Sequence, residues 1–505
     1  MLNLVDNFLN KITMYRLTLY YLIFLVGSAF VLGMFNLLPF TVFRLAFSVV
    51  FLLVFAWIVN KIFSIVFEAP TNFESVYITA LILSLVLTPT KGFSDLQFFA
   101  WAAVGAVSAK FILAINRKHI FNPAAFGMVA ASIATGSAPS WWVGTAYMAP
   151  FVLIGGLLIV RKVRKSDMVL GFLGTALAII IGTSLARGSG LFLTLQRTFL
   201  DSPLLFFTFV MLTEPYTTPV KRTWQVVYGV IVGFLFVPQI HFGPLYTTPE
   251  VALLAGNIFS YVVSPTKRIL LTLKEKVQIA PDMFDFVFLA DKSLPYTAGQ
   301  YLEWTVPHKM VDSRGTRRYF TLASSPTEQE FRMGVKFYPS ASSFKRTLFS
   351  LGEGAQIFAG QLAGEFTMPK DVNQKLVFIA GGIGITPYRS MVKYLLDCGE
   401  KRPITLIYSN KKIQDIVYED IFGRARDQLG LKVVYTLTDP GVPGDWSGKA
   451  GFIDSKMIME EVPDWKSALF YVSGPHSMVN AFEKTLKQMG VGAGQIKIDF
   501  FPGFV

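Results

Sequence analysis

The chain has 505 residues, of which 52% are hydrophobic and 16% are charged, so it is too apolar to be soluble throughout. Its net charge of +13 does not indicate a nucleic-acid partner, because the Lys and Arg residues cluster between apolar runs, where the positive-inside rule expects them. Cys398 is the single cysteine, which excludes a cysteine-ligated iron–sulfur cluster and an internal disulfide. We therefore expect a membrane protein with no metal site.

Apolar runs of about 15 to 25 residues recur along the first half of the chain and stop near Val263. After Ser264 and Pro265 the pattern changes to short alternating strands and glycine-rich turns, which places a domain boundary near residue 266. Cations concentrate in the segments that would lie inside if the C-terminus is cytoplasmic. The sequence predicts ten spans, at residues 17–35, 41–59, 75–88, 96–115, 122–135, 144–160, 168–186, 203–213, 224–238 and 250–263.

Two pairs of similar segments indicate an internal repeat. Residues 87–91 end the third span and residues 212–221 end the eighth, while residues 122–125 open the fifth span and residues 248–251 open the tenth. The copies fall on opposite sides of the membrane, which predicts two five-helix halves of inverted topology. A proline at the mouth of a short span frees backbone amides that can hold a polar ligand at membrane depth, although such prolines also simply mark helix ends.

Residues from about 10 to 264 resemble the membrane subunits that include the D subunit of Rnf complexes and the B subunit of sodium-pumping NADH:quinone reductases. Residues 119–127 and 212–219 carry this resemblance. It implies a bundle that binds flavin and carries electrons, or, in the simpler alternative, one that only anchors the rest of the chain. That family attaches FMN to the threonine of a Ser-Gly-Ala-Thr type motif, and the nearest run here, residues 188–192, lacks the threonine. We expect a second, noncovalent flavin, FMN or riboflavin, with candidate contacts at Asn122, Pro123, Thr213, Thr217 and Thr218.

Histidine count separates this bundle from another family. Transmembrane ferric reductases and NADPH oxidases ligate two haems through paired histidines. The first 264 residues contain only His119 and His241, at predicted helix ends on opposite faces. Bis-histidine haem is therefore excluded.

Residues 268–505 resemble the ferredoxin–NAD(P)H reductase family over essentially their whole length. An R-x-F-T flavin motif comes first, with Arg318, Tyr319, Phe320 and Thr321. Arg318 offers a fork of donors to the FAD pyrophosphate, Phe320 a ring for the flavin to lie against, and Thr321 a hydroxyl near flavin N5. A helix predicted to open at Ser342, Ser343 and Lys345 suits the FAD diphosphate.

A nucleotide-binding half follows. The buried strand 376–380 leads into Gly381, Gly382, Gly384, Thr386 and Pro387 and then a helix. Glycine lets the backbone approach a pyrophosphate, and we expect Thr386 to cap the helix that faces it. A second strand, 404–408, ends at Ser409 and Asn410, where the adenosine ribose should lie. Because no arginine stands there for a 2′-phosphate, NADH is favoured over NADPH.

The last motif lies near the C-terminus. Residues 471–478 include Ser473, Gly474, Pro475 and Met478, where the family commonly has Cys-Gly-Pro, so Ser473 stands in for the thiol beside the nicotinamide. A terminal aromatic shields the flavin in this family, and we assign that role to Phe501, with Phe504 as the second choice. The residues expected at the hydride-transfer centre are Thr321, Ser473 and Phe501.

The sequence therefore predicts a polytopic α-helical membrane domain of about ten spans with an inverted 5+5 repeat (residues 1–265), an antiparallel β-barrel FAD domain (266–372) and an α/β Rossmann-like NAD(P) domain (373–505). The expected function is a multi-pass cell-membrane oxidoreductase that passes electrons from cytoplasmic NAD(P)H through FAD to a membrane flavin and on to a quinone or an extracytoplasmic acceptor. Two alternatives stay open, a membrane-anchored flavin reductase for a soluble acceptor and a redox-regulated transporter or channel. Its partners would be the nicotinamide nucleotide, the electron acceptor and membrane lipid, with the oligomeric state left open.

Overall fold

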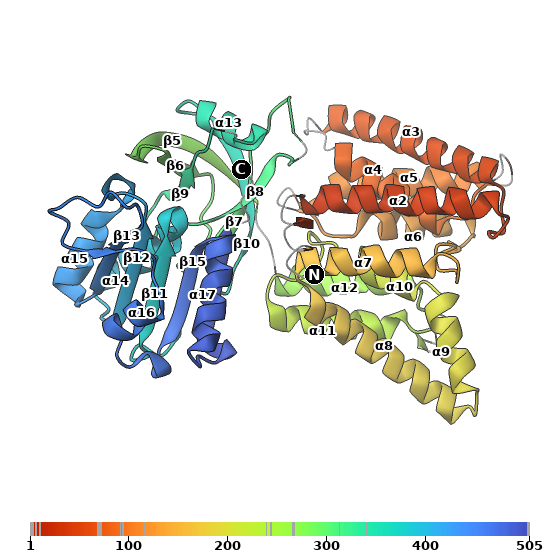
Figure 1. Cartoon of the computed structure of the whole chain (residues 1–505). Helices are drawn as coiled ribbons and strands as arrows, with labels where there is room; N and C mark the ends of the chain where they lie inside the picture. The colour runs from red at the N-terminus through yellow and green to blue at the C-terminus, as the bar shows by residue number, and fades with distance from the viewer. Residues whose placement is uncertain are drawn as a thin grey trace. The chain divides into compact units, whose positions relative to one another are not determined.

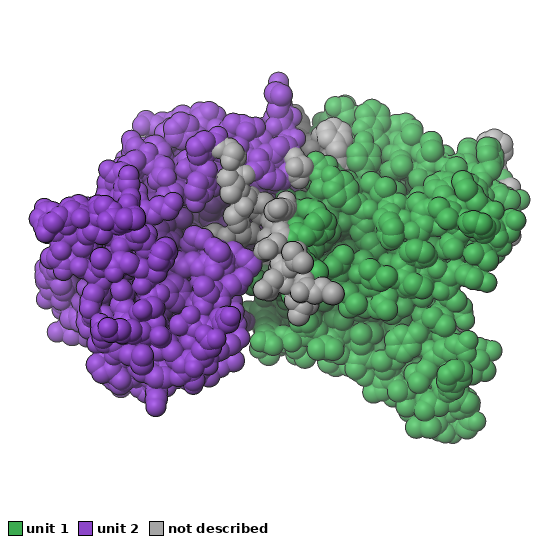
Figure 2. All heavy atoms as spheres, in the orientation of Figure 1, with its two compact units in different colours: residues 1–267 green, residues 268–505 purple. Residues whose placement is uncertain are grey.

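The chain divides into two compact units, Met1–Lys267 and Arg268–Val505 (Figure 2). The computed structural model describes residues 5, 8–9, 12–67, 73–90, 92, 95–115, 118–238, 240–242, 245–264, 268–312, 314–339 and 341–501. Each unit has its own buried core, and each is described separately below.

The first unit is helical (Figure 1). Its helices are α2 (Met14–Met34), α3 (Val42–Val66), α4 (Phe73–Val86), α5 (Leu96–Phe111), α6 (Pro123–Thr135), α7 (Ala149–Val163), α8 (Ser166–Ala186), α9 (Leu191–Leu200), α10 (Leu204–Phe206), the π-helix η2 (Phe207–Met211), α11 (Arg222–Phe236) and α12 (Pro249–Val263). Two short hairpins, β1–β2 (Ala114–Ile115 and Lys118–His119) and β3–β4 (His241–Phe242 and Leu245–Tyr246), precede α6 and α12.

Helical structure lies in each of the ten predicted ranges, and α9 adds a helix that the sequence analysis did not predict. Within the described part of the chain, α2, α3 and α8 are long and apolar enough to cross a membrane, with 21, 25 and 21 residues. Shorter apolar helices of 10 to 17 residues accompany them. The N-terminal helices are therefore suited to span a membrane, while the count of ten spans stays a prediction.

Helices α6 and α12, which open with two similar segments of the sequence, begin in the same way. Asn122 caps α6 by accepting a hydrogen bond from the backbone N–H of Ala125, and Thr248 caps α12 in the same way. A proline follows each cap, where its fixed φ suits the first helical turn and its missing N–H costs nothing. Small residues then let helices approach closely: a Cβ at Gly127 of α6 would lie 2.8 Å from the Cβ of Ala106 on α5.

The second unit begins with an antiparallel sheet that forms a half-barrel. Its strands are β5 (Ile269–Ala280), β6 (Met283–Ala290), β7 (Tyr301–Thr305), β8 (Arg317–Thr321), β9 (Phe331–Lys336) and β10 (Gln356–Ala363), in the order β8-β7-β10-β5-β6-β9. Helix α13 (Ser343–Ser350) closes it, with Phe344 packed into a core that also holds Trp304, Phe286 and Phe288. This sheet is the antiparallel layer that the sequence predicted.

A parallel sheet completes the unit. Its strands are β11 (Leu376–Gly381), β12 (Ile404–Asn410), β13 (Lys432–Leu437), β14 (Lys449–Ala450), β15 (Leu469–Pro475) and β16 (Ile496–Phe501), in the order β14-β13-β12-β11-β15-β16. Helices α14 (Thr386–Cys398) and α15 (Glu419–Leu429) pack on one face, and α16 (Ser455–Glu461) and α17 (His476–Gln488) on the other (Figure 1). The predicted α/β nucleotide-binding layer is confirmed.

Candidate functional site

The predicted nucleotide residues gather at the carboxyl ends of the parallel strands. Strand β11 pairs with β12 on one side and with β15 on the other, so the chain winds in opposite directions from β11. In open α/β sheets such a switch point leaves a crevice outside the strand ends, where ligands bind. Gly381 ends β11, Asn410 ends β12 and Pro475 ends β15, which places all three predicted segments at this crevice.

Glycines make the crevice tight. A Cβ at Gly384 would lie 2.6 Å from the Cα of Gly474, and a Cβ at Gly381 would lie 2.9 Å from Cε of Met478. Gly382 has a positive φ of 51°, which few other residues adopt without strain. These glycines therefore let the end of β11 and the loop that follows it pack closely against the end of β15 and the start of α17.

Thr386 does not have its predicted role. The turn Gly382–Ile385 (η3) runs directly into α14, so Thr386 is the first residue of the helix and the N-cap position falls on Ile385, which forms no side-chain cap. The Thr386 hydroxyl instead donates to the carbonyl of Ile383 at 3.2 Å. Pro387 lies in the first turn of α14, as the sequence predicted.

Ser473 and Thr321 approach the same point from different sheets. Ser473 is fully buried in β15, and its Oγ has no hydrogen-bond partner among the residues that the structure describes. Buried hydroxyls are nearly always paired, so this one is suited to a ligand. Thr321, at the end of β8, donates its hydroxyl to Oδ2 of Asp499 at 2.8 Å. Asp499 stands directly opposite Ser473 in the β15–β16 register, so the flavin motif and the nicotinamide motif meet through it.

Asp499 is a site residue that the sequence analysis missed. The available signal was its position two residues before Phe501, in the terminal segment already assigned to the flavin. Phe501 ends β16, and its backbone pairs with Pro475. The side chain of Phe501 and the whole of Phe504 lie outside the described residues. The structure therefore gives the backbone position of Phe501 in β16, and its role as the shielding aromatic stays a prediction.

The FAD side of the site is built around buried cations. Arg318 is 7% exposed, and its Nη1 donates to the carbonyls of Arg314 and Arg317, both at 2.6 Å. Burial, with a contribution from Arg314, lowers the pKa of Arg318 to about 10 against the opposing charge of Asp312. Burial and the charges of Arg318 and Arg314 lower the pKa of Lys345 to about 8. Cations held so close together gain free energy when a diphosphate enters, which is the donor set that FAD needs.

Some of the neighbouring residues are placed to bind FAD, and others hold the surrounding structure in position. Phe320 stacks on Phe344, with ring centroids 6.0 Å apart, and Tyr319 donates its hydroxyl to Glu303. Ser342 caps α13 by accepting from the backbone N–H of Lys345. Ser343, in contrast, uses its backbone N–H and its hydroxyl to bind Asp312 and His308 in the β7–β8 loop, so it positions that loop.

At the end of β12, Ser409 is half-buried and Asn410 is buried. The carbonyl of Asn410 accepts the backbone N–H of Thr438, which joins the end of β12 to the segment after β13. These residues border the position where the parallel sheet would receive an adenosine ribose.

A second missed feature is a buried ion pair between the two sheets. Arg389 of α14 donates to Oε2 and Oε1 of Glu328 at 2.8 and 3.0 Å and to the carbonyl of Ala323 at 2.6 Å. Burial raises the pKa of Glu328, but the hydrogen bonds and charge of Arg389 outweigh it and hold that pKa below its usual range. Ala323 follows Thr321 by two residues, so α14 is tied to the segment that leaves the flavin motif.

In the first unit, Glu214 contacts two of the predicted residues. Its Oε2 accepts hydrogen bonds from Nδ2 of Asn122 at 2.7 Å and from the hydroxyl of Thr217 at 3.3 Å. Pro123 is buried at the start of α6. The hydroxyls of Thr213 and Thr218 bond instead to backbone carbonyls, of Phe209 and Glu214 respectively.

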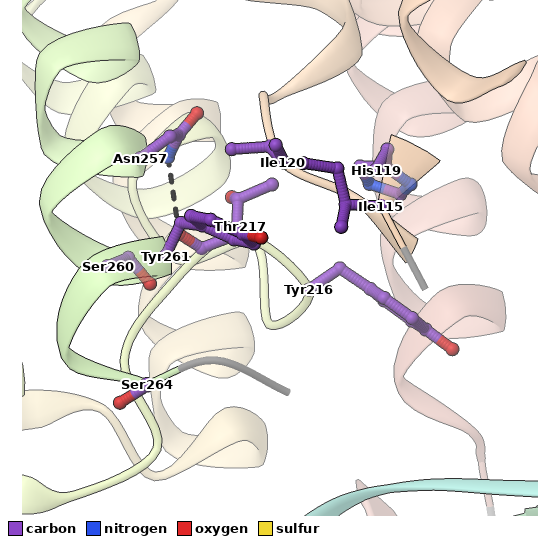
Figure 3. A pocket seen from close by; sticks show the side chains of 9 residues that line it. All are labelled: Ile115, His119, Ile120, Tyr216, Thr217, Asn257, Ser260, Tyr261 and Ser264. Carbon is purple, nitrogen blue, oxygen red and sulfur yellow. Dashed lines mark hydrogen bonds between the residues drawn. The ribbon is translucent and has the colours of Figure 1, made fainter. Parts of the chain in front are cut away.

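A small pocket of about 20 Å³, room for about one water molecule, lies beside this cluster (Figure 3). Asn257 donates from Nδ2 to the carbonyl of Thr217 at 3.3 Å, and His119 stacks on Tyr216 with ring centroids 5.5 Å apart. The residues that line the pocket are Ile115, His119, Ile120, Tyr216, Thr217, Asn257, Ser260, Tyr261 and Ser264.

Comparisons with known proteins agree with the candidate site in the second unit. Residues 378–484 match the family model of the oxidoreductase NAD-binding domain. The chain is 26% identical over 240 residues to a flavohemoprotein of Oceanobacillus iheyensis, covering 45% of this chain and 57% of that protein. It is 26% identical over 279 residues to NADH-cytochrome b5 reductase 1 of Aspergillus terreus, covering 51% of this chain and 92% of the reductase. The chain carries a flavin-dependent NAD(P)H oxidoreductase module.

A further relative is a subunit of the Na(+)-translocating NADH-quinone reductase of Serratia proteamaculans, 30% identical over 161 residues, which cover 31% of this chain and 39% of that protein. Among solved structures, the Amycolatopsis cytochrome P450 reductase GcoB aligns with a TM-score of 0.42 at 24% identity, over 47% of this chain and 70% of GcoB. The chain spans about half the length of the flavohemoproteins it matches. The ferredoxin-reductase-like FAD and NAD module is thus confirmed, while the resemblance of the first unit to the Rnf membrane subunit and its relatives stays a prediction.

Proposed function

We propose that the chain oxidises NAD(P)H at FAD in the second unit and passes the electrons to a redox ring in the first unit, and on to a quinone or an extracytoplasmic acceptor. The observation that carries this proposal is the meeting of Thr321, Asp499 and Ser473, which unites a flavin motif and a nicotinamide motif. FAD, when bound, supplies hydride acceptance at N5 and onward release of electrons. The protein contributes binding and orientation.

The flavin-binding residues have distinct tasks. Arg318 and Lys345 would hold the diphosphate with help from the capped start of α13 at Ser342, and Phe320 would lie against the ring. Thr321 donates its hydroxyl hydrogen to Asp499, and this hydrogen bond fixes the orientation of the hydroxyl near the position that flavin N5 would take. Asp499 is a positioning residue in this proposal, because it acts through Thr321.

The nicotinamide nucleotide would occupy the switch-point crevice. Gly381, Gly382 and Gly384 would receive the pyrophosphate at the start of α14. Ser409 and Asn410 would border the adenosine ribose, with NADH favoured over NADPH. The buried hydroxyl of Ser473 would meet the nicotinamide, whose surroundings Gly474, Pro475 and Met478 complete, and Phe501 would cover the flavin until the nicotinamide displaces it.

In the first unit, the backbone around Asn122 and Pro123 and the run from Thr213 to Thr218 are the proposed walls of a site for a noncovalent flavin, FMN or riboflavin. Support comes from the resemblance to the membrane subunits of Rnf complexes and sodium-pumping reductases, and from a soluble half that is similar to a subunit of an NADH-quinone reductase. The proposed location is the cell membrane, with multiple spans and a cytoplasmic C-terminal unit.

Counting flavins tests the proposal. The detergent-solubilised protein is treated with acid, and the released flavins are separated by chromatography and expressed per chain. The relay requires FAD together with a second flavin. A yield of one flavin per chain, all of it FAD, would refute the relay and favour an anchored reductase that serves a soluble acceptor.

A further inference from the structure

Tyr418 has a strained backbone that the start of its own helix does not require. It precedes α15 with a φ of 60° and a ψ of 28°, a left-handed conformation that costs free energy for a residue with a side chain. An N-cap residue is ordinarily extended, and the Tyr418 side chain forms no cap on α15. Such strain persists only where surrounding contacts hold it, and it clusters at functional sites.

The side chain of Tyr418 reaches from the parallel sheet and its helices to the antiparallel sheet. Its hydroxyl donates to Oδ1 of Asp285 on β6 at 2.6 Å. Asp285 is 2% exposed and stands opposite Gly334 in the β6–β9 register. Burial and the negative charge of Asp285 raise the pKa of Tyr418 well above its ordinary value, so the phenol stays protonated and remains the donor. This hydrogen bond therefore joins the two sheets of the second unit.

A closed ring of contacts includes this hydrogen bond. The Arg389 guanidinium lies over the ring of Tyr418, 5.4 Å from its centroid, and Arg389 forms the bidentate pair with Glu328. Arg332 lies 3.7 Å from Glu328 and 3.9 Å from Asp285, which closes the ring. Each carboxylate thus faces an arginine, so the buried charges compensate one another.

The end of the glycine loop is held beside this ring. Gly334 lacks a Cβ, and a Cβ there would lie 2.7 Å from Cγ2 of Thr386 and 3.0 Å from Oη of Tyr418. Thr386 is 2% exposed and directly follows η3. Its methyl group therefore rests on β9 of the antiparallel sheet, which gives this threonine a place in the motif although it caps no helix.

We propose that Tyr418, held by Asp285, is a positioning residue for hydride transfer, because it fixes the glycine loop relative to the sheet that carries the flavin motif. The inference rests on the reductase chemistry of the second unit and not on the relay through the first. One sheet binds the nicotinamide nucleotide and the other binds FAD, so their relative position sets the approach of the two rings. Tyr418 acts through Thr386 and the loop.

Hydride transfer is sensitive to this approach. In the step, the C4–H bond of the reduced nicotinamide breaks, and its hydrogen and electron pair form the N–H bond at flavin N5, which leaves NAD(P)⁺. A misplacement of about 1 Å between reacting groups can cost about 10²-fold in rate. A smaller displacement, from the loss of one hydrogen bond between the sheets, should cost about tenfold.

The test uses the full-length, detergent-solubilised protein with its FAD. Tyr418→Phe removes only the hydroxyl, and it should slow flavin reduction at saturating NADH by about tenfold in stopped-flow measurements. The dissociation constant of NADH and the FAD content should stay unchanged. Asp285→Ala should slow the step in the same way. Asp285→Asn keeps an oxygen that accepts from the Tyr418 hydroxyl, so it should reduce the flavin close to the wild-type rate.

Tyr388→Phe is the matched control. This fully buried tyrosine of α14 donates its hydroxyl to the carbonyls of Ile379 at 3.1 Å and Tyr471 at 2.8 Å, both in the parallel sheet. The variant should lower Tm at least as much as Tyr418→Phe and leave the rate of flavin reduction unchanged, because both lost partners belong to one sheet. A rate that falls with Tm in both variants would show a structural role and overturn the proposal.

A second measurement does not depend on turnover. In the resting protein without NADH, hydrogen–deuterium exchange in residues 383–389 and 416–422 should be faster in Tyr418→Phe than in wild type, whereas exchange in residues 404–410 should be the same. An unchanged rate of flavin reduction in Tyr418→Phe would overturn the proposal whatever the exchange. A flavin count of one FAD per chain would refute the relay and leave this inference standing.

Discussion

Replacing Arg389 with leucine should destabilise the reductase unit strongly. The side chains of Arg389 and Glu328 are 6% and 14% exposed, and two hydrogen bonds join them in a bidentate pair. Removing one partner of a buried ion pair costs about 3–5 kcal/mol, because the other charge stays in place without compensation. Arg332, 3.7 Å from Glu328, moderates this loss, and the carbonyl of Ala323 adds to it. For a unit of this size the cost corresponds to a fall in Tm of about 6–20 °C.

The assay is thermal unfolding of the full-length protein, followed by the rise in FAD fluorescence as the cofactor is released. Three variants complete a double-mutant cycle: Arg389→Leu, Glu328→Gln and the pair together. Since both residues belong to one interaction, the double variant should lose less stability than the sum of the single variants, by about 0.5–3 kcal/mol. Additive losses, or an Arg389→Leu protein that melts with the wild type, would refute the assignment of this pair as the tie between α14 and the flavin motif.

The stability that Glu328 contributes should depend on pH in one direction. The folded-state pKa of Glu328 is lowered, so its contribution to stability is complete above the unfolded pKa and is lost as the pH falls through the folded pKa. The difference in Tm between wild type and Glu328→Gln should therefore shrink on acidification below the ordinary carboxyl range. A difference that grows on acidification would contradict the pairing.

Four further predictions concern the ligand sites. Arg318→Ala should lose FAD and NAD(P)H oxidation together, as measured by flavin absorbance and NADH consumption; retained FAD would show that the motif has been misassigned. Lys345 has a pKa of about 8 before a diphosphate binds. The affinity of the apoprotein for FAD should therefore fall as the pH rises above about 8, because the amine loses its charge. Lys345→Arg should remove this pH dependence in a fluorescence titration. Gly384→Ala should abolish NADH binding with FAD retained, since its Cβ would lie 2.6 Å from the Cα of Gly474. Unchanged NADH binding, measured by calorimetry, would contradict the assignment of the glycine loop to the nicotinamide nucleotide. Ser473→Ala should preserve Tm but slow flavin reduction in stopped-flow measurements by about tenfold, the effect of one lost hydrogen bond of about 1.4 kcal/mol; an unchanged rate would remove Ser473 from the site.

The fold of the second unit was predictable because its sequence motifs are local and follow one another in a fixed order. The glycine loop between strand 376–380 and its helix, and the flavin motif at Arg318, each combine a residue pattern with a predicted element on either side. The missed residues have partners far away in the chain. Thr321 and Asp499 are 178 residues apart, and Arg389 and Glu328 are 61 apart. A single sequence shows that these side chains are charged or polar but not which strand ends the fold brings together.

Local geometry explains the smaller errors. Thr386 was expected to cap α14, but the glycine loop itself turns as the 3-10 segment η3 and feeds the helix without a cap. Helix α9 was missed because it is short and carries Arg197 and Gln196, which break the apolar run that identifies a span. A sequence pattern averages the residue types over a stretch of chain. The start of α14 and the presence of α9 depend instead on how one turn of the backbone joins the next.

The first unit shows why polar residues inside apolar segments are hard to assign from a sequence. The sequence analysis selected the backbone around Asn122 and Pro123 and the run from Thr213 to Thr218 as candidate walls of a flavin site. In the structure the hydroxyls of Thr213 and Thr218 donate to backbone carbonyls within the same segment, as threonine commonly does near a helix. Glu214, in the same motif, accepts hydrogen bonds both from Thr217 and from Asn122 at the start of α6, 92 residues away. A carboxylate inside an apolar motif must recruit donors, and a single sequence does not show which distant segment supplies them.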